Sequence, residues 1–167
     1  MTDTCQHLPA PLELTDFDGD WQKYCEALYA IFKNDMLIHK PKYNGKDVDV
    51  IHETIFDGKE RSFWHIVSHG KDDYNRVPDL ERASRIPWLY PFINGGNCSH
   101  YLQYSLYHDK SKKNRVYLLC EETGYLVVLE DRIKYYKLIT AFIVDQDRLE
   151  KEKKRYKTYI KNENAYP

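Results

Sequence analysis

The chain has 167 residues, of which 42% are hydrophobic and 31% are charged. This length and apolar content are sufficient for one folded domain and exclude an intrinsically disordered chain. No apolar run approaches the roughly 18 residues that a membrane span requires, and the first residues lack the basic-then-apolar order of a signal peptide. We therefore expect a cytoplasmic protein with no membrane partner.

Charge is unevenly distributed along the chain, although the formal net charge is only −1. Residues 1–20 hold five of the 26 acidic residues and none of the 25 basic ones, so the remaining chain is mildly basic. That balance permits a nucleic-acid partner without requiring one. Four cysteines lie far apart, without a CxxC pair or a histidine at zinc-finger spacing, so we expect reduced thiols and neither a metal nor a cofactor: Cys5, Cys25, Cys98 and Cys120.

The N-terminal half predicts an arm, a helix and then a β-hairpin. Residues 1–17 contain two prolines and no periodicity, so we expect an extended acidic arm. Asp18 or Asp20 is a suitable N-cap for a helix that ends near Leu37, because the apolar residues that follow the cap recur at helical spacing. Strand-like residues then surround the turn signal Asp57-Gly58, and residues 61–67 are predicted as its second strand.

The C-terminal half predicts a short helix, an antiparallel meander and a last helix. The short helix opens after Pro78-Asp79 and is limited by Pro87. Apolar segments separated by turn residues predict four strands, at 101–107, 115–120, 125–129 and 135–144. The expected fold class is α+β, with N-terminal helices packed on a C-terminal antiparallel sheet of about four strands and a C-terminal helix. Its domain organisation is an arm at 1–17, a single domain at 18–145, and a charged helix and tail at 146–167.

The densest group of chemically active side chains follows the predicted strand at 61–67. His65, His69 and Lys71 place two imidazoles and an ammonium group near its end. Histidine titrates near neutral pH, so it can take a proton from a ribose 2′-hydroxyl or give one to a leaving 5′-oxygen. In a strand the two histidines would lie about 13 Å apart, too far for one metal ion. The alternative is a structural histidine beside a turn.

Two further segments carry candidate groups. Arg82 and Arg85 are three residues apart on the predicted short helix, so both guanidinium groups could contact one phosphodiester, or pair with nearby carboxylates instead. Thr140 places a hydroxyl inside an apolar strand, where it needs a partner such as a backbone carbonyl or a phosphate oxygen. Tyr136 is expected to share the face of Thr140.

Taken in chain order, these segments resemble a known family. His-Ile-x-x-His at 65–69 is followed by an arginine-containing helix that runs into Pro87-Trp88. The meander carries Arg-x-Tyr-Leu-Leu, Tyr-Leu-Val-Val-Leu and Leu-Ile-Thr-Ala-Phe. This pattern resembles the barnase–EndoU–colicin–RelE (BECR) superfamily of small RNases, particularly its phage- and mobile-element-associated branch, over roughly residues 48–145.

The resemblance implies a metal-independent endoribonuclease that acts as a toxin or defence effector on RNA, with tRNA as one candidate substrate and an antitoxin or inhibitor protein as a candidate partner. By analogy, His65 is the general base or acid, assisted by His69 or Lys71. Arg82 and Arg85 then stabilise the charge that develops on phosphorus, and Thr140 positions the phosphate. Many toxins of this kind are distinctly basic, whereas this chain is nearly neutral.

Substrate binding is expected at Tyr136 and at the basic loop that carries Lys112, Lys113 and Arg115, since cationic loops can follow a phosphate backbone. A solvated loop is the alternative. The main rival function is a non-enzymatic interaction protein, such as an inhibitor, an immunity protein or a phage-encoded blocker that binds another protein. Near-zero net charge and 15 tyrosines fit that hypothesis as well.

Overall fold

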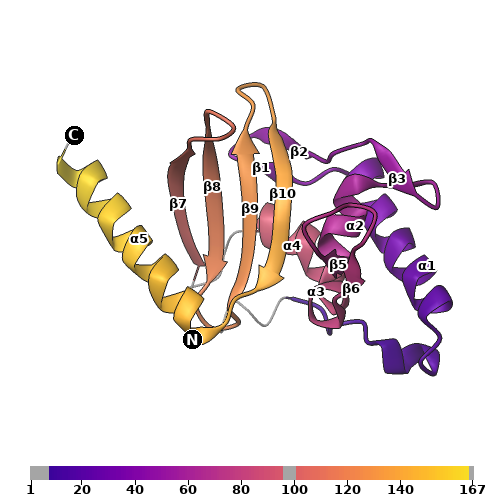
Figure 1. Cartoon of the computed structure of the whole chain (residues 1–167). Coiled ribbons are helices and arrows are strands. Elements are labelled where there is room, and N and C mark those ends of the chain that lie inside the picture. The colour runs from indigo at the N-terminus through magenta and orange to yellow at the C-terminus, as the bar shows by residue number, and fades with distance from the viewer. Residues whose placement is uncertain (1–7, 96–100, 166–167) are drawn as a thin grey trace.

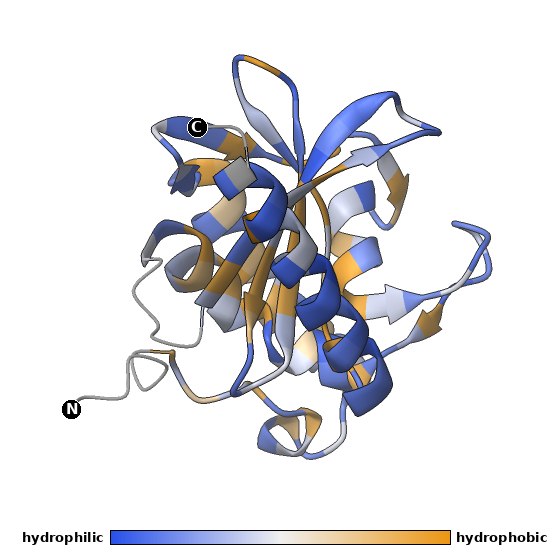
Figure 2. Ribbon diagram, turned by 90° about the vertical axis from the view of Figure 1, so that its left-hand side faces the viewer, coloured by the Kyte–Doolittle hydropathy of each residue, from blue (hydrophilic) through white to orange (hydrophobic). Residues whose placement is uncertain are grey.

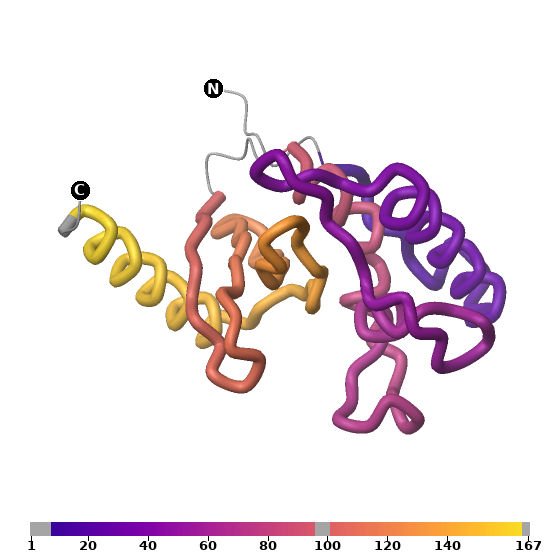
Figure 3. The backbone as a smooth tube through the Cα atoms, turned by 90° about the horizontal axis from the view of Figure 1, so that it is seen from above, coloured from indigo at the N-terminus to yellow at the C-terminus, as the bar shows by residue number. Residues whose placement is uncertain are grey.

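The computed structural model describes residues 8–95 and 101–165. In this part of the chain, helices α1 to α4 lie on one face of the main sheet and α5 lies on the other (Figures 1 and 3). The helical elements are η2 (Leu14–Phe17), α1 (Trp21–Phe32), η3 (Lys33–Ile38), α2 (Arg61–Val67), α3 (Leu80–Ser84), η4 (Ile86–Trp88), α4 (Leu89–Gly95) and α5 (Gln146–Ala165). The expected combination of N-terminal helices, a sheet and a C-terminal helix is confirmed.

Within the described residues the main sheet has six strands rather than about four, in the order β1-β2-β10-β9-β8-β7. The predicted meander forms its larger part, with every neighbouring pair antiparallel. The strands of this sheet are β1 (Lys42–Tyr43), β2 (Lys46–Asp49), β7 (Tyr101–His108), β8 (Lys113–Cys120), β9 (Tyr125–Asp131) and β10 (Tyr136–Ile143). The two extra strands come from the N-terminal half, and no local pattern in the sequence announces that long-range pairing.

The pairing between β2 and β10 is short and parallel. It joins Tyr136 to Val48 and Lys137 to Asp49, and leaves the rest of the β10 edge without a neighbouring strand in the described structure. Helices α2 and α3 pack against β10. Residues of these helices can therefore reach around the edge of the sheet to the face that carries α5.

Two hydrophobic cores lie on opposite faces of the sheet. The larger one joins α1 to α4 with side chains such as Val127 and Leu129, whereas Leu126 and Val128 belong to a smaller core beneath α5. Alternation along β9 thus buries both faces, as the uninterrupted apolar run at 125–129 predicts. Figure 2 shows these apolar strands behind a largely hydrophilic α5.

Helix α1 begins where its predicted N-cap places it. The Asp20 carboxylate accepts a hydrogen bond from the Lys23 backbone N–H at 3.1 Å, which satisfies one of the free donors of the first turn. Tyr24, Leu28 and Phe32 recur along the buried face of α1. The helix then continues as the wider turns of η3 to Ile38, close to the predicted end.

The segment 61–67 is the helix α2, so its prediction as a strand is wrong. The turn at Asp57-Gly58 does join two short strands, β3 (Thr54–Phe56) and β4 (Lys59–Glu60), but the helix begins directly afterwards. Phe63, Ile66 and Val67 are buried together at helical spacing, i, i+3 and i+4. That period, rather than the high content of bulky apolar residues, decides the local structure.

Helix α3 opens at the predicted place, with Asp79 as its N-cap. Ala83 and Ile86 are buried, whereas Leu80 is 45% exposed. Helix α5 starts at Gln146, and Leu149, Tyr156 and Tyr159 pack on the smaller core. Among the described helices, none combines the length and hydropathy that crossing a bilayer requires.

Candidate active site

His65 stands in the last turn of α2 and is held by a carboxylate from the following loop. Its Nε2 lies 2.8 Å from Asp73 Oδ1, and its side chain is 27% exposed. Arg61, one turn earlier on α2, lies 3.3 Å from Asp73 Oδ2. The hydrogen bond with His65, and the positive charges of Arg61 and Arg76, hold the pKa of Asp73 below its ordinary value despite partial burial. Asp73 is therefore a carboxylate that fixes the orientation of the imidazole.

The loop that carries Asp73 is held in place by Arg76. It lies between β5 (Ser68–His69) and β6 (Val77–Pro78), which pair with each other. Arg76 donates to the Ser68 hydroxyl at 2.8 Å, to the Ser68 carbonyl at 2.7 Å and to the Gly70 carbonyl at 3.0 Å. These three bonds join the two ends of the loop, and Asp73 is presented to His65 from a fixed backbone.

The second histidine is held by a second aspartate. His69 Nδ1 lies 3.2 Å from Asp79 Oδ2, and Arg82 Nε lies 3.4 Å from the same oxygen. Arg82 also donates to the backbone carbonyl of His65 at 3.3 Å. The two histidines, predicted as candidates for proton transfer, thus lie in histidine–aspartate pairs that Arg82 connects.

Arg82 extends this group to the sheet. Its guanidinium lies 4.9 Å above the ring of Phe142 on β10, and Arg148 of α5 lies over the same ring at 5.9 Å. Phe142 is on the face that carries α5, and that face is only partly covered, because α5 crosses at the β7 side (Figure 1). Arg82 therefore links His65 to Arg148 and to the sheet face along the edge of β10.

Thr140 lies on that same face, but Tyr136 does not. A β-bulge between Leu138 and Thr140 places Thr140 opposite Val128, in the register of the smaller core. Tyr136 belongs to the larger core and is only 4% exposed. The prediction that both share one face is wrong, because one extra residue in a bulge reverses the alternation. Burial of Tyr136 also argues against its predicted contact with substrate.

The side chain of Arg85 contacts different groups from those that Arg82 contacts. It donates to the Ser84 hydroxyl at 2.8 Å, and its guanidinium lies 5.4 Å from the ring centre of Trp88. The two arginines share no recorded partner among the described residues. The expectation that both contact one phosphate is therefore not met by the side-chain positions in this structure.

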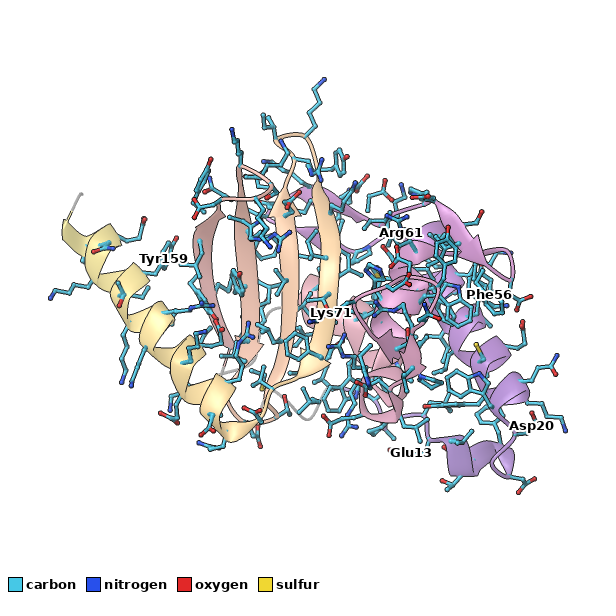
Figure 4. All side chains as sticks on the ribbon, viewed as in Figure 1. Glu13, Asp20, Phe56, Arg61, Lys71 and Tyr159 are labelled. Atoms are coloured by element: carbon cyan, nitrogen blue, oxygen red, sulfur yellow. The ribbon has the colours of Figure 1, made fainter. Side chains whose placement is uncertain are left out.

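Lys71 is exposed beside the histidine pairs. In the view of Figure 4 it lies toward the sheet, whereas Phe56 lies on the far side of α2, toward α1. No ion pair of Lys71 occurs in the described structure. Its ammonium group is thus available to a ligand that approaches the sheet face.

The basic residues predicted to bind substrate between β7 and β8 differ in their exposure and in their partners. Lys112 is exposed and Lys113 is half-buried at the start of β8. Arg115 pairs with Glu130 at 3.1 Å, and Arg132 lies 2.6 Å from the other oxygen of Glu130. Since Glu130 is only 1% exposed, Arg115 neutralises a buried charge. Its predicted contact with substrate competes with that structural task.

Asp73, which holds His65, also lines a cavity of about 280 Å³. Sequence reasoning did not single out its lining or the two aspartates that hold the histidines. Aspartates in a polar loop carry no distinguishing pattern, and Asp79 was expected as a helix start and as an ion-pair partner of the arginines, which it is for Arg82, but not as a partner of His69. The lining residues come from the start of α1, from β3, from α2 and from the β5–β6 hairpin: Trp21, Phe56, Trp64, Ser68, Asp73, Tyr74, Arg76 and Pro78.

Asp79 has two tasks, which substitution can separate. Its Oδ1 accepts from the Arg82 backbone N–H at 3.1 Å as the N-cap of α3, and its Oδ2 faces His69 and Arg82. We expect Asp79→Ala to lower the free energy of unfolding by about 1 kcal/mol, as loss of a cap does. Asp79→Asn keeps an acceptor and should stay close to wild type in urea unfolding. Equal destabilisation by both variants would show that the charge, not the cap, stabilises α3.

Comparison of the chain with models of known protein families, with curated proteins and with solved structures gives no match. In the described part of the chain, no three His, Cys, Asp or Glu side chains are grouped so as to hold a metal ion.

Proposed function

We propose that the protein is a metal-independent endoribonuclease that acts as a toxin or defence effector. The observation that carries this proposal is the pair of aspartate-held histidines joined by Arg82 next to an open sheet face. Two imidazoles can move both protons of a phosphodiester transfer, and an arginine can stabilise the charge that develops between them. The resemblance of the sequence to BECR RNases points to the same chemistry.

The roles follow from which nitrogen each aspartate holds. Asp73 engages Nε2 of His65, so a proton on Nε2 leaves Nδ1 as the base that accepts the proton of the ribose 2′-hydroxyl. The 2′-oxygen forms a bond to phosphorus, and the bond from phosphorus to the 5′-oxygen breaks. Asp79 lies against Nδ1 of His69, so that a proton carried on Nε2 of this imidazole is the one given to the leaving 5′-oxygen. The products are a 2′,3′-cyclic phosphate and a 5′-hydroxyl.

Cationic groups around the histidines support binding of the phosphate chain. Arg82 contacts Asp79 and the backbone carbonyl of His65, Lys71 is exposed on the loop, and Arg148 lies over the ring of Phe142. Thr140 lies on the same face two residues before Phe142 on β10, where its hydroxyl can donate to a phosphate oxygen.

The direct test is incubation of purified protein with total cellular RNA in excess EDTA. Discrete fragments that end in 2′,3′-cyclic phosphate would support the proposal, and tRNA and ribosomal RNA can be compared as substrates in the same lanes. Induced expression in a bacterial host provides the biological readout, since an active RNase slows growth.

The two arginines of the α3 segment give a sharper test. We expect Arg82→Gln to reduce the cleavage rate about 100-fold, because loss of one preorganised donor to the transition state has effects of that order. Arg85→Gln should change the rate only a few-fold, since its guanidinium contacts Ser84 and Trp88 instead. Initial rates on one labelled RNA measure both, and the opposite ranking would contradict the assignment of Arg82.

A second candidate function is a non-enzymatic interaction protein. It is favoured by the exposed apolar side chains of Phe56, Tyr74 and Val77, which belong to β3, to the loop between β5 and β6, and to β6. Intact RNA in every assay, a harmless wild type and a stoichiometric protein partner in a pull-down would together favour this function over the enzyme.

A further inference from the structure

We propose that the cavity beside Asp73 binds a nucleobase of the RNA and that its polar rim selects guanine. The inference rests on the proposed function and deepens it, since it assigns a base-recognition site next to the site of cleavage. At about 280 Å³ the cavity is at the small end of ligand sites and suits one aromatic ring system rather than a larger molecule.

The walls of the cavity are aromatic. Trp21 comes from the start of α1, Trp64 from α2 and Phe56 from the hairpin before it. The rings of Phe56 and Trp64 are 5.4 Å apart and inclined by 64°, so a planar base that stacks on one meets the edge of the other. Tyr74 is 81% exposed at the rim and can add a second stacking surface. Stacking on such side chains is the usual way in which proteins hold an unpaired base.

The polar rim offers both acceptors and donors. Asp73 uses one oxygen for His65 and the other for Arg61, and each carboxylate oxygen can accept a second hydrogen bond. Arg76 uses three of its five N–H groups within the loop, so two remain. Guanine is the base that presents neighbouring N–H donors on one edge and the acceptors O6 and N7 on another.

The charges of the rim argue against a cationic ligand. An aromatic cavity with one carboxylate is also the usual site for a quaternary ammonium group. Here, however, Arg76 lines the cavity, and Arg61, which also pairs with Glu53, already pairs with Asp73, so guanidinium groups balance the charge of the Asp73 carboxylate. A neutral base attached to an anionic phosphate chain fits this balance better than a cation does.

Asp73 connects the cavity to the proposed chemistry. One of its oxygens contacts His65 and the residue itself lines the cavity, so a base in the cavity lies one side chain away from the imidazole. Arg82 donates to the backbone carbonyl of the same histidine. A nucleotide can therefore place its base in the cavity and its phosphate near Arg82.

Calorimetric titration with the four nucleoside monophosphates tests this inference without any cleavage. We expect guanosine monophosphate to bind at least about tenfold more tightly than the adenosine, uridine and cytidine compounds. Tyr74→Ala should weaken its binding about tenfold, with no change in the unfolding midpoint because Tyr74 is exposed. Tyr107→Ala removes a similarly exposed tyrosine from β7 and should leave binding unchanged.

Asp73→Asn provides the test of the polar rim. It should abolish the preference for guanosine monophosphate while stacking on the aromatic walls still permits weak binding. Equal affinity for all four nucleotides in the wild type, no binding at all, or no effect of Tyr74→Ala would each overturn the inference. Guanine-selective binding without RNA cleavage would contradict only the proposed enzyme, whereas cleavage without nucleotide binding would contradict only the base site.

Discussion

His65→Ala should abolish the cleavage of RNA in EDTA, with a fall in initial rate of at least about 100-fold. The expected size is that of removing a general base or acid from a proton-transfer step. The imidazole is partly exposed, so its removal should leave the fold intact, and circular dichroism and thermal unfolding verify this. Induced expression of the variant should also relieve any growth defect that the wild type causes.

His52→Ala is the matched control for this experiment. His52 also contacts an aspartate, with Nε2 at 2.7 Å from Asp49 Oδ1, and it is exposed on the segment after β2. His52 therefore makes the same kind of histidine–aspartate contact as His65, but it lies outside the segment that carries His65 and His69. Full activity of His52→Ala beside an inactive His65→Ala would assign the effect to position. Comparable rates for His65→Ala and wild type would exclude His65 from the reaction.

Arg115→Ala should destabilise the protein by about 2–3 kcal/mol at neutral pH. Its partner Glu130 is 1% exposed, and removing one member of a buried ion pair leaves a charge that is no longer fully compensated. Arg132 still contacts Glu130, which limits the loss. Urea unfolding measures the difference. Lys113→Ala, two residues earlier on the same strand, is the control and should change stability by less than about 0.5 kcal/mol.

The ion pair between Arg115 and Glu130 also predicts that the stability of the folded protein depends on pH. Burial opposes ionisation of Glu130, but the hydrogen bonds from Arg115 and Ser111 and the charge of Arg132 outweigh it, so its pKa in the folded protein lies below 4.5. A lowered pKa stabilises the folded state above the unfolded-state pKa, and this stabilisation is lost as the pH falls through the folded-state pKa. The gap in stability between wild type and Arg115→Ala should therefore narrow below about pH 4.5. A gap that is constant from pH 7 to pH 3 would show that Glu130 is not the group concerned.

Local sequence patterns determined most of the fold. The cap at Asp20, the turn at Asp57-Gly58 and the apolar runs of the meander were sufficient because each depends on residues a few positions apart. The error at 61–67 has a physical explanation. Bulky apolar residues favour strands, but Phe63, Ile66 and Val67 bury one face together only in a helix.

The candidate site could be predicted only in part. The sequence by itself proposed the histidines, Lys71, Arg82 and Arg85 as candidates from the chemistry of their side chains, and Thr140 because its hydroxyl interrupts an apolar strand. Tertiary structure decided which of them meet. The loop after α2 brings Asp73 to His65, the capping aspartate turns toward His69, and the bulge in β10 separates Tyr136 from Thr140. Those contacts depend on chain reversal and on a one-residue shift of register. Neither leaves a local signal, so only the folded chain shows which polar groups share an environment.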